Sequence, residues 1–256
     1  YNVNSSYDGR NRQNGSEFII FEVEPGYIPS GVTDTPSTDT NYYNTTLLLN
    51  FNDNVDDSSN YAHTVIPQGN FSYASSPASP VTNGGKVGNF VASSGYTSLQ
   101  IPDSIGLKFG TGDFTIEGRV YINSTDTNLS GYNRRIFQKG PNSTSGYGLF
   151  YDSSTIWFGR TDETILTNAR SNWNGAWKHF AIVRDSGTFR MYLNGVQVSS
   201  SSTGGTTALD VDAPLYLGVY PADPTSAASN HYLDEFRITK GICSCLLYTS
   251  DAADDT

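Results

Sequence analysis

Short apolar runs alternate with clusters of turn residues along most of the chain. Residues 114–122 show the pattern most clearly, because Phe114, Ile116, Val120 and Ile122 occupy alternate positions. Successive side chains of a strand point to opposite faces, so this run predicts a strand with one face in a core and the other exposed or lining a groove. No stretch shows the repeat of an amphipathic helix.

Further apolar runs follow at short and regular spacing. They lie at residues 47–51, 87–90, 97–101, 135–138, 147–151, 155–158, 177–184, 189–193, 196–198, 215–217 and 232–238. Many short strands separated by turn signals are typical of an antiparallel sandwich or barrel. We therefore predict an all-β fold of two antiparallel sheets.

The strongest turn signal is the dipeptide Asn194-Gly195, which separates two of these runs. Both residue types accept the positive φ angles that a two-residue hairpin turn requires. We expect a hairpin whose strand register is set by this turn.

The composition divides the chain into four parts. Residues 1–29 hold an apolar run ended by a Pro-Gly turn, and we interpret them as the last strands of an upstream domain. Residues 30–44 are rich in Ser, Thr, Pro and Asp, which is linker composition. Residues 45–242 carry the strand pattern. Residues 243–256 hold both cysteines, and their end resembles the translation of a sequencing-library adapter; the alternative is a disordered natural tail.

The chain is acidic, with a net charge of −10 and a pI near 4.6. Such a field repels a phosphate backbone, which argues against a nucleic-acid partner. No stretch reaches the roughly 18 consecutive apolar residues of a membrane-spanning helix, so we expect no membrane insertion.

Four segments together resemble the laminin-G-like domains of the concanavalin A-like lectin and glucanase group. They are residues 112–117, 177–195, 217–218 and 233–238. The resemblance implies a jelly-roll of two curved sheets, one of them concave. Similar modules occur in tail or fibre proteins of marine phages, which also carry the segment at 237–241, and in bacterial surface proteins. The resemblance therefore implies a location on a virion or on an extracellular or cell surface.

The sequence argues against catalysis. Glucanases of related fold carry the triplet Glu-x-Asp-x-Glu on one strand, where carboxylates flank the scissile bond. No such triplet occurs in this chain. His63, His179 and His231 are scattered, and we interpret His179, on an alternating strand, as a hydrogen-bonded core residue. We predict a protein that is not an enzyme.

Sugar-binding sites use flat aromatic faces for stacking and polar groups for the hydroxyls. The candidates in or next to loops are Trp173, Tyr147, Tyr151 and Tyr220, together with Arg119 on the outward side of its strand. Trp173 lies in a polar loop, so we expect it to be partly exposed. Trp157 lies inside an apolar run and is interpreted as a core residue.

The acidic loop at residues 52–58 is the best metal candidate. Calcium takes six to eight oxygen ligands, which Asp53, Asp56 and Asp57 would help to supply. Laminin-G-like domains often hold one calcium, and the resemblance implies that Asp234 approaches this loop. The alternative is a solvated turn in which Asp57 accepts hydrogen bonds from nearby backbone N–H groups.

Three functions stay open. The first, which we predict, is a non-catalytic carbohydrate- or receptor-binding module of a phage virion or tail protein, with a host-surface glycan or receptor as partner. The second is a structural spacer in a fibre or bacterial adhesin, packed against other virion subunits. The third is a polysaccharide hydrolase whose catalytic residues lie elsewhere.

Overall fold

The computed structural model describes residues 10–13, 16–19, 42–81, 85–91, 95–124, 134–140, 146–160, 163–202, 208–224 and 229–241. The chain divides into two compact units, Tyr1–Asp39 and Thr40–Thr256. In the first unit, β1 (Arg10–Gln13) and β2 (Ser16–Ile19) pair as an antiparallel hairpin. The rest of the expected upstream remnant, most of the expected linker and the tail at 243–256 lie outside the described residues.

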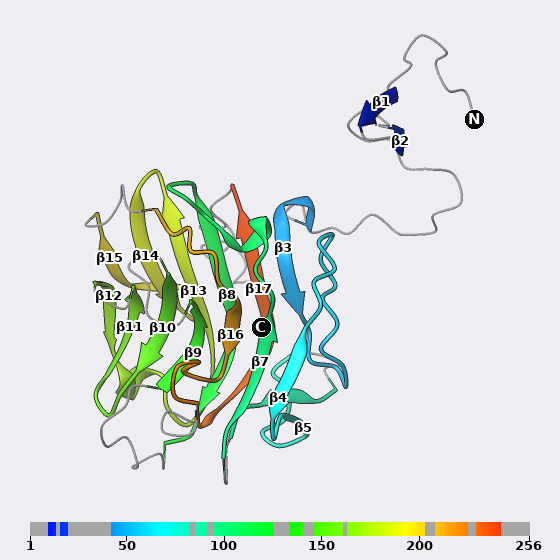
Figure 1. The fold of residues 1–256 in the computed structure, drawn as a ribbon. Coiled ribbons are helices and arrows are strands. Elements are labelled where there is room, and N and C mark those ends of the chain that lie inside the picture. Colours follow the sequence, from blue (N-terminus) through cyan, green and yellow to red (C-terminus); the bar gives the residue numbers. More distant parts are fainter. Residues whose placement is uncertain are drawn as a thin grey trace. The chain divides into compact units, whose positions relative to one another are not determined.

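The second unit is built from two antiparallel sheets (Figure 1). The seven-stranded sheet has the order β12-β11-β10-β9-β16-β7-β4. Its strands are β4 (Ile66–Gly69), β7 (Thr97–Ile101), β9 (Arg134–Lys139), β10 (Tyr147–Tyr151), β11 (Thr155–Gly159), β12 (Thr164–Ala169) and β16 (Leu215–Leu217).

The eight-stranded sheet has the order β15-β14-β13-β8-β17-β6-β5, and β3 also pairs with β17. Its strands are β3 (Thr45–Leu49), β5 (Ser72–Ala74), β6 (Val87–Asn89), β8 (Phe114–Ile122), β13 (Trp177–Asp185), β14 (Thr188–Leu193), β15 (Val196–Ser201) and β17 (His231–Lys240). The helical segments within the described residues are the 3₁₀ turns η1 (Tyr42–Asn44), η2 (Ile105–Leu107) and η3 (Arg170–Asn172). The prediction of an all-β, two-sheet antiparallel sandwich is confirmed.

Strand β8 shows how the alternating sequence builds the sandwich. Phe114, Ile116, Val120 and Ile122 are fully buried, as the pattern predicts, while Arg119 on the opposite face is partly exposed. The strand lies between β13 and β17 in the eight-stranded sheet, so its outward residues occupy the middle of that sheet's outer face.

The inward faces of the two sheets meet in one apolar core. Phe137 on β9 and Phe180 on β13 come from different sheets, and their ring centroids lie 6.5 Å apart. Phe236 on β17 also packs against Phe137, at 5.6 Å. Each large apolar side chain buried in this way contributes roughly 1.5–3 kcal/mol to folding.

The turn between β14 and β15 has the expected geometry. Asn194 and Gly195 both take positive φ angles, 49° and 77°, which is the combination that a two-residue hairpin turn needs. The Asn194 side chain also accepts a hydrogen bond of 2.9 Å from the backbone N–H of His179 on β13. This turn therefore joins three strands of the sheet.

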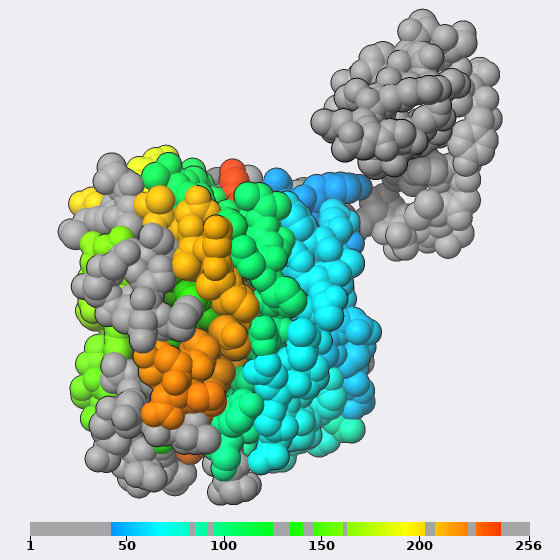
Figure 2. Space-filling model, in the orientation of Figure 1, coloured from blue at the N-terminus to red at the C-terminus, as the bar shows by residue number. Residues whose placement is uncertain are grey.

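Figure 2 shows one face of the second unit, where β4 (cyan), β7 (green) and β16 (gold) lie side by side, in agreement with their pairing. None of the helical segments among the described residues is long and apolar enough to cross a membrane.

Candidate functional site

Trp173 lies in the core and not at the surface. Its side chain is 0% exposed, and its Nε1–H donates a hydrogen bond of 3.0 Å to Oδ1 of Asn168. The η3 turn directly before it reverses the chain, and the ring packs 6.2 Å from the ring of Phe180. The prediction that Trp173 is partly exposed is wrong, because a polar loop can still direct one ring inward.

Tyr147 and Tyr151 on β10 are also buried. The Tyr147 hydroxyl donates to the carbonyl of Leu107 at 3.0 Å, and burial raises the pKa of this phenol. The Tyr151 hydroxyl accepts a hydrogen bond of 3.1 Å from the backbone N–H of Asn230. Neither ring offers a face to a sugar, so the choice of these residues as exposed ligand contacts is corrected.

The two other candidates stay partly exposed but lie on different sheets. Tyr220 follows β16 of the seven-stranded sheet, and the guanidinium carbon of Arg135 lies 4.2 Å from its ring centroid. Burial lowers the pKa of Arg135 to about 10. Arg119 lies on the outer face of the eight-stranded sheet, next to His179 in the cross-strand register.

His179 is not a core residue. Its side chain keeps 20% of its surface exposed, and its Nε2 lies 3.2 Å from Oε2 of Glu117. The expected hydrogen bond is present, but it lies on the outer face of the sheet.

Three of the four aspartates of the expected calcium site have separate partners, and the fourth, Asp56, is exposed. Asp53 pairs with Lys86 at 2.8 Å, while the Asp57 carboxylate accepts hydrogen bonds from backbone N–H groups, among them that of Leu48. Asp234 is fully buried and accepts a hydrogen bond from the Ser79 hydroxyl. Among the described residues no three acidic, His or Cys side chains are placed to hold a metal ion. Calcium binding therefore stays a prediction that their arrangement does not support.

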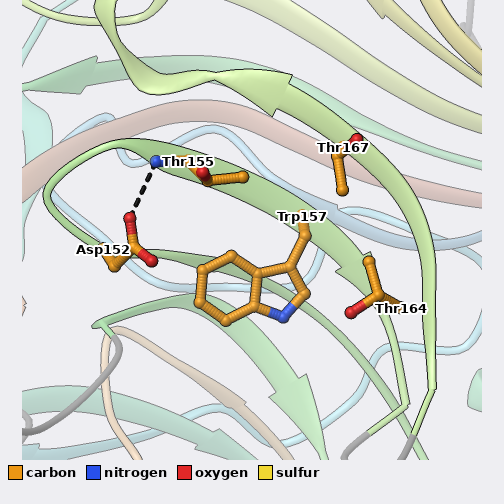
Figure 3. A pocket seen from close by; sticks show the side chains of 5 residues that line it. All are labelled: Asp152, Thr155, Trp157, Thr164 and Thr167. Carbon is orange, nitrogen blue, oxygen red and sulfur yellow. Dashed lines mark hydrogen bonds between the residues drawn. The ribbon is translucent and has the colours of Figure 1, made fainter.

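A hollow of about 330 Å³ lies where β10, β11 and β12 meet on the seven-stranded sheet. It is lined by Asp152, Thr155, Trp157, Thr164 and Thr167. In Figure 3 the Trp157 indole lies beside the Asp152 carboxylate, with the threonine side chains around it.

Trp157 is placed in this hollow by strand alternation. Its neighbours Ile156 and Phe158 are fully buried, so the intervening side chain points outward and is partly exposed. In the register Trp157 lies between Phe150 on β10 and Thr167 on β12, and its ring centroid is 5.7 Å from that of Phe150. The interpretation of Trp157 as a core residue is wrong. The alternation within the run at 155–158 was the signal that could have identified it.

Asp152 supplies the charge of the hollow. Its Oδ1 accepts hydrogen bonds of 2.7 Å from the backbone N–H groups of both Ser154 and Thr155. Partial burial alone would raise the pKa of Asp152, but these hydrogen bonds and the nearby Arg170 hold it below its ordinary value. The other oxygen, which accepts no hydrogen bond from a described residue, lies toward the indole in Figure 3.

A buried arginine holds the turn that carries Asp152. Arg170 is 3% exposed, and its Nη1 donates to the Asp152 carbonyl at 3.1 Å. Its Nη2 donates to the carbonyl of Asn123, and its guanidinium carbon lies 5.3 Å from the Tyr151 ring centroid. The turn is thereby anchored to the core beneath it. The hollow thus joins an aromatic face, a fixed carboxylate and several hydroxyls, a set that can stack on an apolar ring face and bond to polar substituents.

Comparison with known proteins agrees with this architecture. A family model for the concanavalin A-like lectin/glucanases superfamily matches residues 93–244. No curated protein matches the sequence significantly.

Several solved structures share the fold at low sequence identity. The binding domain of Paraclostridial Mosquitocidal Protein 1 is 16% identical with a TM-score of 0.62, and the match covers 81% of this chain and 52% of that one. The receptor-binding domain of botulinum neurotoxin D is 15% identical with a TM-score of 0.61, covering 81% and 53%. The botulinum neurotoxin DC binding domain in complex with SialylT is 16% identical with a TM-score of 0.59, covering 81% and 51%. The chain thus spans about half the length of these structures.

Likeness at such low identity speaks for the fold alone. The family match extends over more than half of the chain, and the motifs at 112–117, 177–195 and 233–238 form the strands β8, β13, β14 and β17 of the sandwich. The chain therefore belongs to the concanavalin A-like lectin/glucanases superfamily.

Proposed function

We propose that this chain is a non-catalytic carbohydrate-binding module, and that the hollow around Trp157 holds a sugar ring. The observation that carries the proposal is the partly exposed indole beside the ordered Asp152 carboxylate. A pyranose stacks its apolar face on an aromatic ring, while its hydroxyls need hydrogen-bond acceptors and donors. Asp152 is the acceptor, and the hydroxyls of Thr155, Thr164 and Thr167 can take either role.

The charge of the site favours a neutral sugar. Asp152 is ionised near neutral pH because its pKa is held low, and the chain as a whole carries −10. An anionic sugar would meet repulsion both from this carboxylate and from the overall field.

The similar structures are named as binding domains, and two botulinum neurotoxin DC domains are named with SialylT and with rat synaptotagmin II. These names support a binding role for the fold, in which the partner of this chain is a glycan or receptor on a host surface. A position on a virion or on an extracellular surface accords with such a partner.

The experiment is a glycan array probed with the full chain and with Trp157→Ala. We expect the glycan affinity of the variant to be lower by roughly tenfold or more, because the aromatic surface on which the sugar stacks has been removed. Tyr43→Ala, which removes an 82% exposed ring elsewhere, is the control and should bind normally. Equal binding by all three proteins would reject the Trp157 hollow as the sugar site, and no bound glycan would reject the binding role in favour of a structural spacer.

A separate assay addresses catalysis. The full chain, incubated with the polysaccharides that it binds, should release no reducing ends. If the Trp157→Ala variant still released reducing ends, the chain would be a hydrolase instead.

A further inference from the structure

The outer face of the eight-stranded sheet carries a second group of polar and aromatic side chains. The strand register arranges them in adjacent cross-strand rows on β13, β8 and β17. One row is Trp177, Tyr121 and Tyr232, and the next is His179, Arg119 and Asp234. These rows lie on the sheet opposite to the one that carries the Trp157 hollow.

The aromatic row is a continuous surface. The Tyr121 ring lies 5.9 Å from the Trp177 ring and 6.2 Å from the Tyr232 ring, both in edge-to-face contact. All three side chains are partly exposed. The hydroxyls of Tyr121 and Tyr232 make no hydrogen bond with a described residue, so both are available to a ligand.

Two charged side chains beside this row are unpaired within the described part of the chain. Arg119 is partly exposed and makes no hydrogen bond or ion pair with any described residue. The Glu235 carboxylate likewise makes none with a described residue, and the charge of Arg119 lowers its pKa against the larger effect of burial. Charged groups of this kind form strong hydrogen bonds when a partner is present, so both can contribute to binding a ligand.

Glu235 is held in this position by a strained backbone. Its φ angle is 50°, at the register shift where β17 bulges between Asp234 and Arg237. A residue other than glycine in this conformation costs roughly 1–3 kcal/mol, and such strain collects at functional sites. Burial, and then the charge of Asp234, raise the pKa of Glu235.

The segment that contains Ala78 and Ser79 packs against this face. The Trp177 Nε1–H donates to the Ala78 carbonyl at 2.7 Å, and the Ser79 hydroxyl donates to Oδ2 of Asp234 at 2.6 Å. These bonds fix the orientation of Trp177 and occupy Asp234. Arg119 and Glu235, which are bonded to none of the described residues, therefore remain beside the rings for a ligand.

We propose that this face holds a second carbohydrate site, in which Arg119 donates to and Glu235 accepts from neighbouring hydroxyls of a neutral pyranose that lies against the Tyr121 row. The opposite charges of the pair cancel, which disfavours a ligand with a net charge. Sugar hydroxyls are both donors and acceptors, so one ring satisfies both side chains at once. The chain would then bind glycans on two opposite faces, which raises avidity for a surface that presents many copies.

The test uses the indole N–H resonances of the full ¹⁵N-labelled chain, titrated with neutral hexasaccharides of glucose, mannose, xylose and galactose. Trp177 reports on this site, Trp157 on the other face, and buried Trp173 is the internal reference. A bound hexasaccharide should shift the Trp177 signal and leave Trp173 unmoved. Shifts caused only by acidic oligosaccharides, or no Trp177 shift at saturation, would overturn the proposal.

Two variants assign the residues. Arg119→Met should weaken the hexasaccharide affinity measured from the Trp177 signal roughly tenfold or more. This is the usual loss for a hydrogen bond to a charged group. Arg190→Met, which breaks a partly exposed pair with Asp185 in the same sheet, is the matched control. Trp157→Ala should leave the Trp177 response intact, so failure of one site is distinguishable from failure of the other. Equal responses of Arg119→Met and Arg190→Met would reject the site.

Glu235→Gly separates function from folding. Glycine accepts a φ of 50° without strain, so the variant should raise Tm by about 2–4 °C while weakening the Trp177 response. Unchanged binding in a stabilised variant would remove Glu235 from the site and contradict the proposal.

Discussion

The outer faces of the two sheets use their tryptophans in different ways. On the seven-stranded sheet, Trp157 lies in a hollow beside a carboxylate that is bonded to its own turn. On the eight-stranded sheet, Trp177 belongs to a row of rings and is tied by its indole N–H to the segment at Ala78. Trp173, between these two in sequence, lies in the core. The polarity of neighbouring residues therefore does not decide the exposure of a ring: alternation along β11 turns Trp157 outward, while Trp173 is buried although it lies in a polar loop.

The largest expected effect comes from the core tryptophan. Trp173→Ala should lower the free energy of unfolding by about 3–5 kcal/mol, because it leaves a cavity and removes the hydrogen bond from the indole to Asn168. Trp157→Ala should cost under about 1 kcal/mol, since its ring is partly exposed. Urea denaturation measures both. Similar losses in the two variants would show that Trp157 is a packing residue and not a ligand contact.

The second-largest effect on stability is expected at Glu117, on the outer face of the eight-stranded sheet. Glu117→Leu should cost about 2–3 kcal/mol, because Arg237 donates to Glu117 at 2.7 and 2.6 Å and would lose that partner in a largely buried position. Asp185→Asn, which weakens the partly exposed pair with Arg190, should cost less than about 1 kcal/mol. Thermal unfolding of both variants measures the difference. Equal losses of stability would mean that water replaces Glu117 as the hydrogen-bond partner of Arg237.

Acid should lower the free energy of unfolding through His231, a buried residue that lies on neither outer face. His231 is fully buried, its ring nitrogens have no hydrogen-bond partner within the described part of the chain, and burial lowers its pKa to about 3. The unfolded chain therefore binds the proton more readily than the folded one between pH 6.5 and 3. The free energy of unfolding should fall as the pH drops through 6.5, by about 2 kcal/mol at pH 5.

Replacing this histidine isolates its contribution. In His231→Leu, the fall in urea midpoint between pH 8 and pH 5 should become much smaller. A residual slope is expected, because burial also lowers the pKa of His63. An unchanged slope would mean that the acid response arises from other groups.

The smallest effect on stability is expected at the hollow itself. Asp152→Asn should cost under about 1 kcal/mol at pH 7, since the carboxylate is partly exposed. Its pKa is lowered on folding, so its contribution is present above the ordinary carboxylate pKa and lost as the pH falls through the folded value. The Tm difference between wild type and variant should therefore shrink as the pH falls below the ordinary carboxylate pKa. Glycan binding at pH 7 should still fall, which separates ligand contact from folding.

The strand pattern allowed the fold to be predicted. Alternation in β8 and the Asn194-Gly195 turn led directly to buried faces and a hairpin, because both signals depend on neighbours in the chain. The choice of Tyr147, Tyr151 and Trp173 as ligand contacts failed for two reasons. Tyr147 and Tyr151 share the inward face of β10 with Leu149, whereas Trp173 follows the η3 turn and lies outside the strands. Arg119 lies on the outward side of its strand, as the alternation in β8 predicts.

The short alternating strands follow from the amino-acid sequence, because alternation is a property of each strand alone. Which outward side chains become neighbours depends on how the strands assemble. Trp157 lies beside Asp152 across the turn between β10 and β11, and Arg119 lies opposite Asp234, which precedes Glu235 on a strand far away in sequence. Such meetings depend on sheet order and on a bulge in β17, which arise from the packing of the whole sandwich and leave no local pattern to read.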